Sequence, residues 1–172
     1  MIQSELTKMA LVPNKGIKKY ITVVRNKELH FLFFGFIINL FWEIVQMPLF
    51  TSYQEATFLG INTACIQASA GDAVMIVVSF LILAILFKSR EWIYQLNTFR
   101  IGLFLIPGLV FTIIAEHLAI GPLGRWEYGN LMPVLPFFGT GVVPIIQWMV
   151  IPALVLWVVR KSYPPILNGG HQ

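Results

Sequence analysis

Four apolar runs dominate this 172-residue sequence, and each is long enough to cross a lipid bilayer. A helix needs about 20 mostly apolar residues to span the hydrocarbon. We expect spans over residues 31–50, 68–87, 101–120 and 142–159. None of the runs alternates strictly, and each is too long for one strand of a membrane β-barrel. The sequence therefore predicts an all-α integral membrane four-helix bundle.

Composition supports the bilayer as the solvent. Hydrophobic residues make up 57% and charged residues 12% of the chain, and the mean hydropathy is +0.75, unlike a soluble protein. The length allows one domain, which we place at 29–161, between a basic arm (1–28) and a tail (162–172). The first span is not expected to be a cleaved signal, because it contains Glu43 and lacks a small-x-small cleavage site. The single Cys65 excludes an internal disulfide and paired-thiol redox chemistry.

Basic residues predict the orientation, because Lys and Arg near helix ends favour the cytoplasmic side. Arg125 alone of the twelve lies on the opposite side. The other eleven are Lys8, Lys15, Lys18, Lys19, Arg25, Lys27, Lys88, Arg90, Arg100, Arg160 and Lys161. We expect an up-down-up-down topology with both termini cytoplasmic, loops 51–67 and 121–141 external, and residence in a bacterial inner membrane.

The net charge of +4 does not indicate nucleic-acid binding, because the basic residues flank spans and no binding module surrounds them. Attraction to anionic lipid explains them more simply. The expected partner is membrane lipid, and the oligomeric state stays open.

Polar residues interrupt one end of every span. Asn39, Glu43 and Gln46 have the i, i+4, i+7 spacing of one helix stripe. Asp72 begins the second span, and the others are Thr112 and Glu116 late in the third and Gln147 early in the fourth. With alternating helices, all of them should meet in the external half, whereas the inner half is almost wholly apolar. Intramembrane carboxyl groups are candidate functional groups by default.

Each polar residue also has a structural interpretation. Glu43 could hydrogen-bond to Gln46 or Gln147 and hold helices together. Asp72 could cap the second helix, because exposed amides and the helix dipole favour an acid there. His117 adjoins Glu116 but points about 100° away around the helix.

The external loop contains five Gly and four Pro residues over 121–144, which predicts repeated turns. Trp126 and Tyr128 could simply anchor it at the membrane interface. The sharper hypothesis is a lid over the bundle, with Arg125 paired to Glu116 or Asp72 or presented to an anionic headgroup.

The stretches "WEIVQMPLF", "CIQASAGD", "GRWEY" and "MPVLPFFGTGVVPIIQW" resemble a family of small bacterial four-span membrane proteins of uncharacterised function. Trp126, Tyr128, Gly139 and Pro144 are also similar to a pattern in membrane lycopene cyclases and related carotenoid-modifying proteins. Those cyclases have a Pro-x-Glu-Glu stretch, whereas this chain has Gln147 and Trp148 after Pro144. The resemblance implies an isoprenoid-like substrate and does not carry over the cyclase chemistry.

Two hypotheses follow. The first is a membrane enzyme, an isomerase or cyclase acting on a lipid or isoprenoid by acid–base chemistry. Its candidate catalytic residues are Glu43, Asp72, Glu116 and, as an adjunct, His117. Its candidate substrate-binding residues are Asn39, Gln46, Arg125, Trp126, Tyr128 and Gln147.

No cofactor is expected for this enzyme. The acids could instead hold a divalent metal, but no His-x-x-x-His or similar ligand spacing supports one. The second hypothesis is a non-enzymatic binding, transport-accessory or assembly protein in which the polar residues lock helices together. Polar groups confined to one half of the spans argue against a continuous pore.

Overall fold

The computed structural model describes residues 26–51, 57–136 and 139–163. Its long helices are α3 (Lys27–Gln46), α5 (Phe58–Leu86), α6 (Thr98–Ile120) and α7 (Val142–Ser162). Each of these four is long and apolar enough to cross a membrane. For this part of the chain, the prediction of an all-helical protein with four candidate spans is confirmed. Most of the predicted arm and nearly all of the tail lie outside the described residues.

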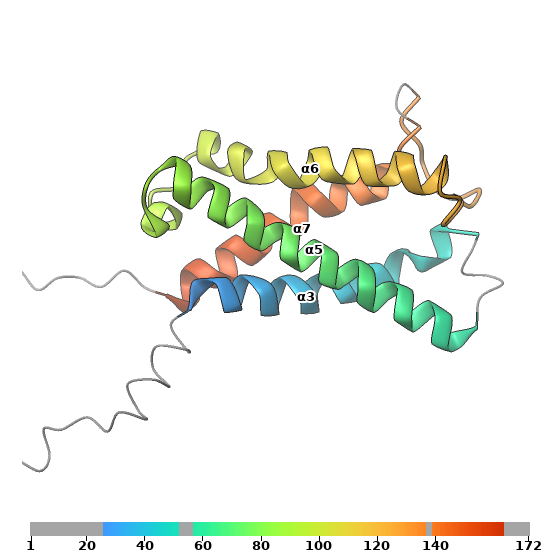
Figure 1. The fold of residues 1–172 in the computed structure, drawn as a ribbon, viewed down its shortest axis with the longest axis horizontal. Coiled ribbons are helices and arrows are strands. Elements are labelled where there is room, and N and C mark those ends of the chain that lie inside the picture. The colour runs from blue at the N-terminus through green and yellow to red at the C-terminus, as the bar shows by residue number, and fades with distance from the viewer. Residues whose placement is uncertain (1–25, 52–56, 137–138, 164–172) are drawn as a thin grey trace, which may run out of the picture.

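The four helices form a bundle in which each neighbour runs in the opposite direction (Figure 1). Helix α3 packs against α5 and α7, and α6 packs against the same two helices. At one end of the bundle α3 begins and α7 ends; we call it the basic end. At the other, the loop end, α3 ends and α7 begins.

Two short 3-10 helices complete these ends: η1 (Met47–Leu49) and η2 (Arg90–Tyr94). Pro48 accounts for the change at η1, because it cannot donate a backbone hydrogen bond to continue α3. Helix η2 was not anticipated. It places Trp92 and Ile93 in the interior, where Trp92 packs beside Phe80 and Phe104. Aromatic side chains therefore fill the basic end.

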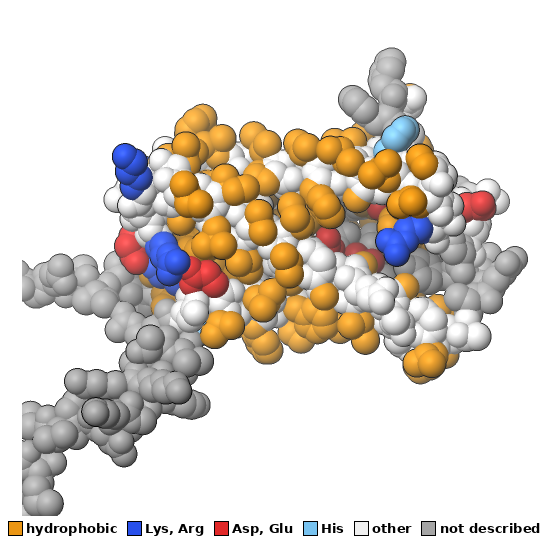
Figure 2. All heavy atoms as spheres, viewed as in Figure 1, with side chains coloured by type: hydrophobic (Ala, Val, Ile, Leu, Met, Phe, Trp, Pro, Cys, Tyr) orange, Lys and Arg blue, Asp and Glu red, His pale blue; other side chains and the backbone are white. Residues whose placement is uncertain are grey.

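The outer surface of the bundle is apolar. Phe33, Phe41, Val45 and Ile85 are among the large hydrophobic side chains that are mostly exposed. Figure 2 shows such side chains spread over the face formed by α5 and α6. This arrangement suits a hydrocarbon solvent and not water.

Helix α5 corrects the predicted second span, because it begins at Phe58, ten residues before the expected start at Ala68. Most of the predicted external loop 51–67 is therefore helical. Thr57 caps the helix by accepting a hydrogen bond from the Gly60 amide. The prediction that Asp72 caps α5 is wrong, since Asp72 lies near the middle of it.

Two polar residues in the first turns of α5 bond to their own helix. Asn62 and Thr63 each donate a side-chain hydrogen bond to the carbonyl oxygen four residues earlier, at 2.8 Å. Their polar groups are thus satisfied within the helix. At about 1.5 Å per residue, a helix of 29 residues is about 43 Å long, which exceeds the ~30 Å hydrocarbon thickness.

The other bounds differ less. Asn26 caps α3 through the Glu28 amide, so the helix begins four residues before the expected Phe31. Asn97 caps α6 through the Arg100 amide. The sequence prediction omitted these polar first turns because it followed apolar residues only.

Two glycines permit close approach between helices. A Cβ on Gly35 would lie 3.3 Å from the Ala73 Cα, which fixes the crossing of α3 and α5. A Cβ on Gly108 would lie 1.9 Å from Trp148 Cζ3, so the indole ring lies directly on the α6 backbone. Small residues at such contacts are typical of membrane helix packing.

Alanine at two glycines of α6 should therefore have opposite effects. Gly108→Ala should destabilise the protein by about 1–3 kcal/mol, because the added methyl overlaps the Trp148 ring. Gly102→Ala is the matched control: open space surrounds that position, and alanine favours a helix by up to about 1 kcal/mol. Thermal unfolding in mild detergent measures both. Equal melting temperatures would contradict this packing.

Candidate functional site

Polar side chains from all four long helices meet in the half of the bundle nearer the loop end. Asn39, Glu43 and Gln46 of α3 are at least nine-tenths buried, as is Gln147 of α7. Thr112 and Glu116 of α6 are buried too, and Asp72 of α5 is half-buried. The structure thus brings together residues that lie more than 100 positions apart in the sequence.

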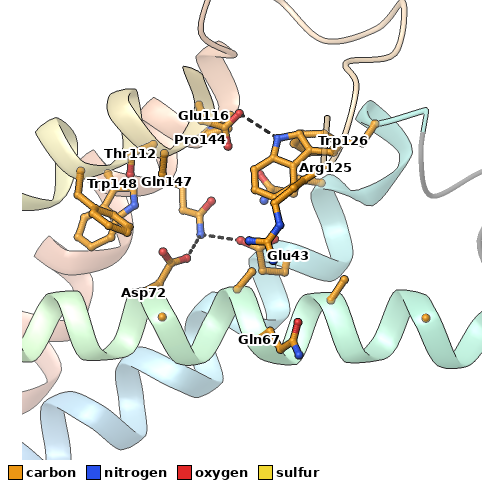
Figure 3. Close-up of a pocket in the computed structure, with 18 residues that line it drawn as sticks. Glu43, Gln67, Asp72, Thr112, Glu116, Arg125, Trp126, Pro144, Gln147 and Trp148 are labelled. Atoms are coloured by element: carbon orange, nitrogen blue, oxygen red, sulfur yellow. Dashed lines mark hydrogen bonds between the residues drawn. The ribbon is translucent and has the colours of Figure 1, made fainter. Parts of the chain in front are cut away.

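Gln147 is the centre of one group, which we call the Gln147 cluster: Gln147, Asn39, Glu43 and Asp72. Its amide nitrogen lies 2.9 Å from Asn39 Oδ1, 3.0 Å from Glu43 Oε1 and 2.9 Å from Asp72 Oδ2. Figure 3 shows the amide between the two carboxyl groups. An amide NH₂ has two hydrogens, whereas three acceptors surround it. The cluster therefore holds more acceptors than this donor can satisfy.

Asn39 is oriented by its own helix, because its amide nitrogen donates to the Gly35 carbonyl at 2.8 Å. Its oxygen is thereby turned toward Gln147. Gly35 has two roles, as the contact point with α5 and as the partner that orients Asn39.

Glu116 is the centre of a second group, the Glu116 cluster: Glu116, Trp126 and Tyr128. Its Oε2 atom accepts from the Tyr128 hydroxyl at 2.5 Å and from the Trp126 indole nitrogen at 3.4 Å. The Tyr128 hydroxyl itself accepts from the Gly141 amide at 2.6 Å. The phenol proton is therefore directed at the carboxyl oxygen, which acts as an acceptor.

The loop 121–141 carries Trp126 and Tyr128 to this position because backbone hydrogen bonds attach it to the end of α3. The Thr51 amide donates to Glu127 O at 3.0 Å, and the Gly129 amide donates to Leu49 O at 2.8 Å. A Cβ on Gly129 would lie 3.1 Å from that oxygen. Residue 129 thus allows the loop to lie against η1.

A cavity of about 600 Å³ separates the diverging ends of α5 and α6. Its polar lining residues are Glu43, Gln46, Gln67, Asp72, Thr112, Glu116, Arg125, Trp126 and Gln147. Figure 2 shows the recess from outside, with acidic side chains visible inside it and a cationic side chain at its edge. Both clusters therefore contribute carboxyl groups to one space.

Other predicted site residues are placed differently. Arg125 is exposed and lines the cavity; within the described residues it forms no ion pair with Glu116 or Asp72. That predicted pairing is wrong, and presentation to an anionic headgroup stays a prediction. His117 is exposed on α6 and does not line the cavity. Tyr128 does not line the cavity, but its hydroxyl group is hydrogen-bonded to Glu116, which does.

Gln67 and Trp148 are among the lining residues that the sequence analysis did not assign to the site. Gln67 fell in the segment expected to be a loop. Trp148 read as an ordinary apolar residue, and its contact with Gly108 joins two helices 40 positions apart, which local spacing does not indicate. Across the described ranges, no three His, Cys, Asp or Glu side chains are arranged to hold a metal ion.

Comparison with protein-family models, with curated proteins and with solved structures gives no match to this chain. The fold and the site define a class in physical terms: a helical integral membrane protein with a cavity lined by carboxyl groups. Any role must be argued from the chemistry of that site.

Tyr128 should titrate late. Partial burial, and then its hydrogen bond to Glu116, raise the pKa of the phenol above its ordinary value. Because the unfolded phenol has a pKa of about 10, the folded protein binds this proton more tightly, and stability should fall as pH rises above that value.

Absorbance titration of tyrosinate should show this as a late component that Tyr128→Phe removes. N-acetyltyrosinamide in the same micelles is the control. If the absorbance that Tyr128→Phe removes instead titrates at the same pH as the control, the hydrogen bond between Tyr128 and Glu116 is contradicted.

Proposed function

We propose that this protein is a membrane-embedded acid–base enzyme, of isomerase or cyclase type, that acts on a lipid or isoprenoid. The observation that supports it is the convergence of Glu43, Asp72 and Glu116, from three helices, on one cavity. Acid–base catalysis needs groups that give and take protons within reach of one bound molecule. A purely structural use would not require a space beside them.

The hydrogen bonds suggest a different role for each carboxyl group. Glu116 accepts two donors at one oxygen, which suits a carboxylate acting as a base. Glu43 and Asp72 compete with Asn39 for the two hydrogens of Gln147. A proton on one of these two carboxyl groups would relieve that shortage. Glu43 also has a hydrogen bond to Gln46, whereas Gln147 is the side-chain donor to Asp72, so we assign Asp72 as the group that holds the proton.

The reaction then balances without a redox partner. The Asp72 carboxyl group gives its proton to one carbon of a C=C bond, which forms a C–H bond and leaves a cation on the other carbon. Glu116 removes a proton from an adjacent carbon, and the double bond re-forms there. Attack by a second double bond on the cation before that loss would close a ring. Water at the loop end restores the proton to Asp72 and removes it from Glu116.

Deuterium incorporation tests this proposal without knowledge of the substrate. Membranes that contain the protein, incubated in D₂O with their own lipid extract, should place deuterium on carbon in one lipid class. Asp72→Asn and Glu116→Gln should each lower that rate about 100-fold or more. Mass spectrometry of the lipids measures it. Glu91→Gln is the control, because that carboxyl group pairs with Lys27 at the basic end.

The same labelling in membranes that lack the protein would refute the enzyme. A second candidate function, an interhelical lock, is favoured by the amide of Gln147, which joins α3, α5 and α7. Glu43→Gln and Glu116→Gln separate the two functions. Both variants should accumulate nearly normally in the membrane if the carboxyl groups act in catalysis. Loss of both would favour the lock.

We also propose that the basic end faces the cytoplasm of the bacterial inner membrane. Lys27, Arg90, Arg160 and Lys161 lie at that end, whereas Arg125 lies at the loop end. The positive-inside tendency supports this orientation, which would place both termini in the cytoplasm and the cavity in the outer half of the bilayer.

Cysteine labelling tests the orientation. In a Cys65→Ala background, an impermeant maleimide added outside should modify a cysteine placed at Asn130 and spare one placed at Ser89. Both positions are exposed, at opposite ends of the bundle. Labelling at position 89 alone would reverse the topology.

A further inference from the structure

The cavity opens sideways between α5 and α6. Small residues form the α5 wall: Gly60, Ala64, Ala68 and Gly71. Nothing lies within 4 Å of the position that a Cβ on Gly71 would occupy. Exposed apolar residues flank the opening, including Leu59 on α5 and Phe111 and Ile114 on α6. These exposed apolar side chains suit contact with hydrocarbon at the opening.

The inner wall of the cavity has an excess of hydrogen-bond acceptors. The indole N–H of Trp126 and the O–H of Tyr128 are directed to Glu116. The amide hydrogens of Gln147 are shared among three oxygens, and Gln46 hydrogen-bonds Glu43 as well. As a carboxylate, Glu116 has about four acceptor sites on its two oxygens, and Trp126 and Tyr128 both donate to Oε2, so the other oxygen receives no donor from its cluster. The remaining charged donor, Arg125, is exposed at the edge.

We propose that the cavity takes an amphiphile directly from the bilayer, between α5 and α6, and that its head group is a hydrogen-bond donor, either a hydroxyl or an ammonium. The head would lie against Asp72 and Glu116, and its hydrocarbon chain would pass over Gly71 and beside Phe111. The volume of about 600 Å³ lies within the range of about 300–1,000 Å³ for small-ligand sites. This names the substrate class of the proposed enzyme and rests on that function.

Three probes of equal chain length test the head group: hexadecanol, hexadecylammonium and hexadecyl methyl ether. The ether accepts hydrogen bonds but donates none. With purified full-length protein in mild detergent, the alcohol or the ammonium should raise the melting temperature by about 5 °C at a hundredfold excess over Kd. The ether should not. The larger of the two shifts identifies the neutral or the charged head.

Two matched leucine variants test the route. Gly71→Leu fills the opening without meeting a neighbour and should abolish the shift, whereas Gly102→Leu, equally unobstructed on α6 but outside the cavity, should retain it. Ala68→Leu is a second filling variant in case the first does not fold. An equal shift with the ether would overturn the donor requirement. A full shift in both filled variants would overturn the route.

The outcomes also separate this inference from the proposed reaction. Donor-selective binding without deuterium incorporation would leave the inference standing and refute the enzyme. Deuterium incorporation with no preference among the three probes would support the enzyme and refute the inference about the head group.

Discussion

The rest of the structure depends on one constraint: polar side chains placed in hydrocarbon must find partners inside the protein. Gln147 meets that need for three helices at once, because its amide lies within hydrogen-bond distance of Asn39, Glu43 and Asp72. None of these groups can turn outward without losing its partner. The cluster therefore fixes the rotation of α3, α5 and α7 about their axes and sets the depth at which they meet.

The two halves of the bundle differ in their interiors: hydrophobic side chains fill the half at the basic end, whereas the half at the loop end contains the cavity. At the basic end, the ring centroids of Phe31 and Phe80 are 4.7 Å apart. Trp92 from η2 packs into the same hydrophobic cluster. At the loop end, α5 diverges from α6 (Figure 1), and the short helix η1 contains no aromatic residue comparable to Trp92. The Trp148 ring, seated on Gly108, forms the boundary between the filled half and the hollow half.

Much of this arrangement could be predicted from sequence. Helical spacing placed Asn39, Glu43 and Gln46 on one face, and alternating spans brought Asp72, Glu116 and Gln147 to the same half of the bundle. Local sequence patterns did not predict the first turns of α5 or the contacts of Gln147 and Trp148. The first turns of α5 contain Asn62 and Thr63, polar residues whose side chains bond to their own helix. The three-way contact of Gln147 and the approach of Trp148 to Gly108 arise from packing between helices, which periodicity within one helix does not encode.

The central claim is that Gln147 and Asp72 act as one interacting pair. A double-mutant cycle measures this directly, with free energies of unfolding determined for Gln147→Ala, Asp72→Ala and the double variant in mild detergent. The 2.9 Å contact predicts a coupling of about 0.5–3 kcal/mol, the range for residues in one hydrogen-bond network. Additive effects would show that the two side chains do not interact, and would contradict the account.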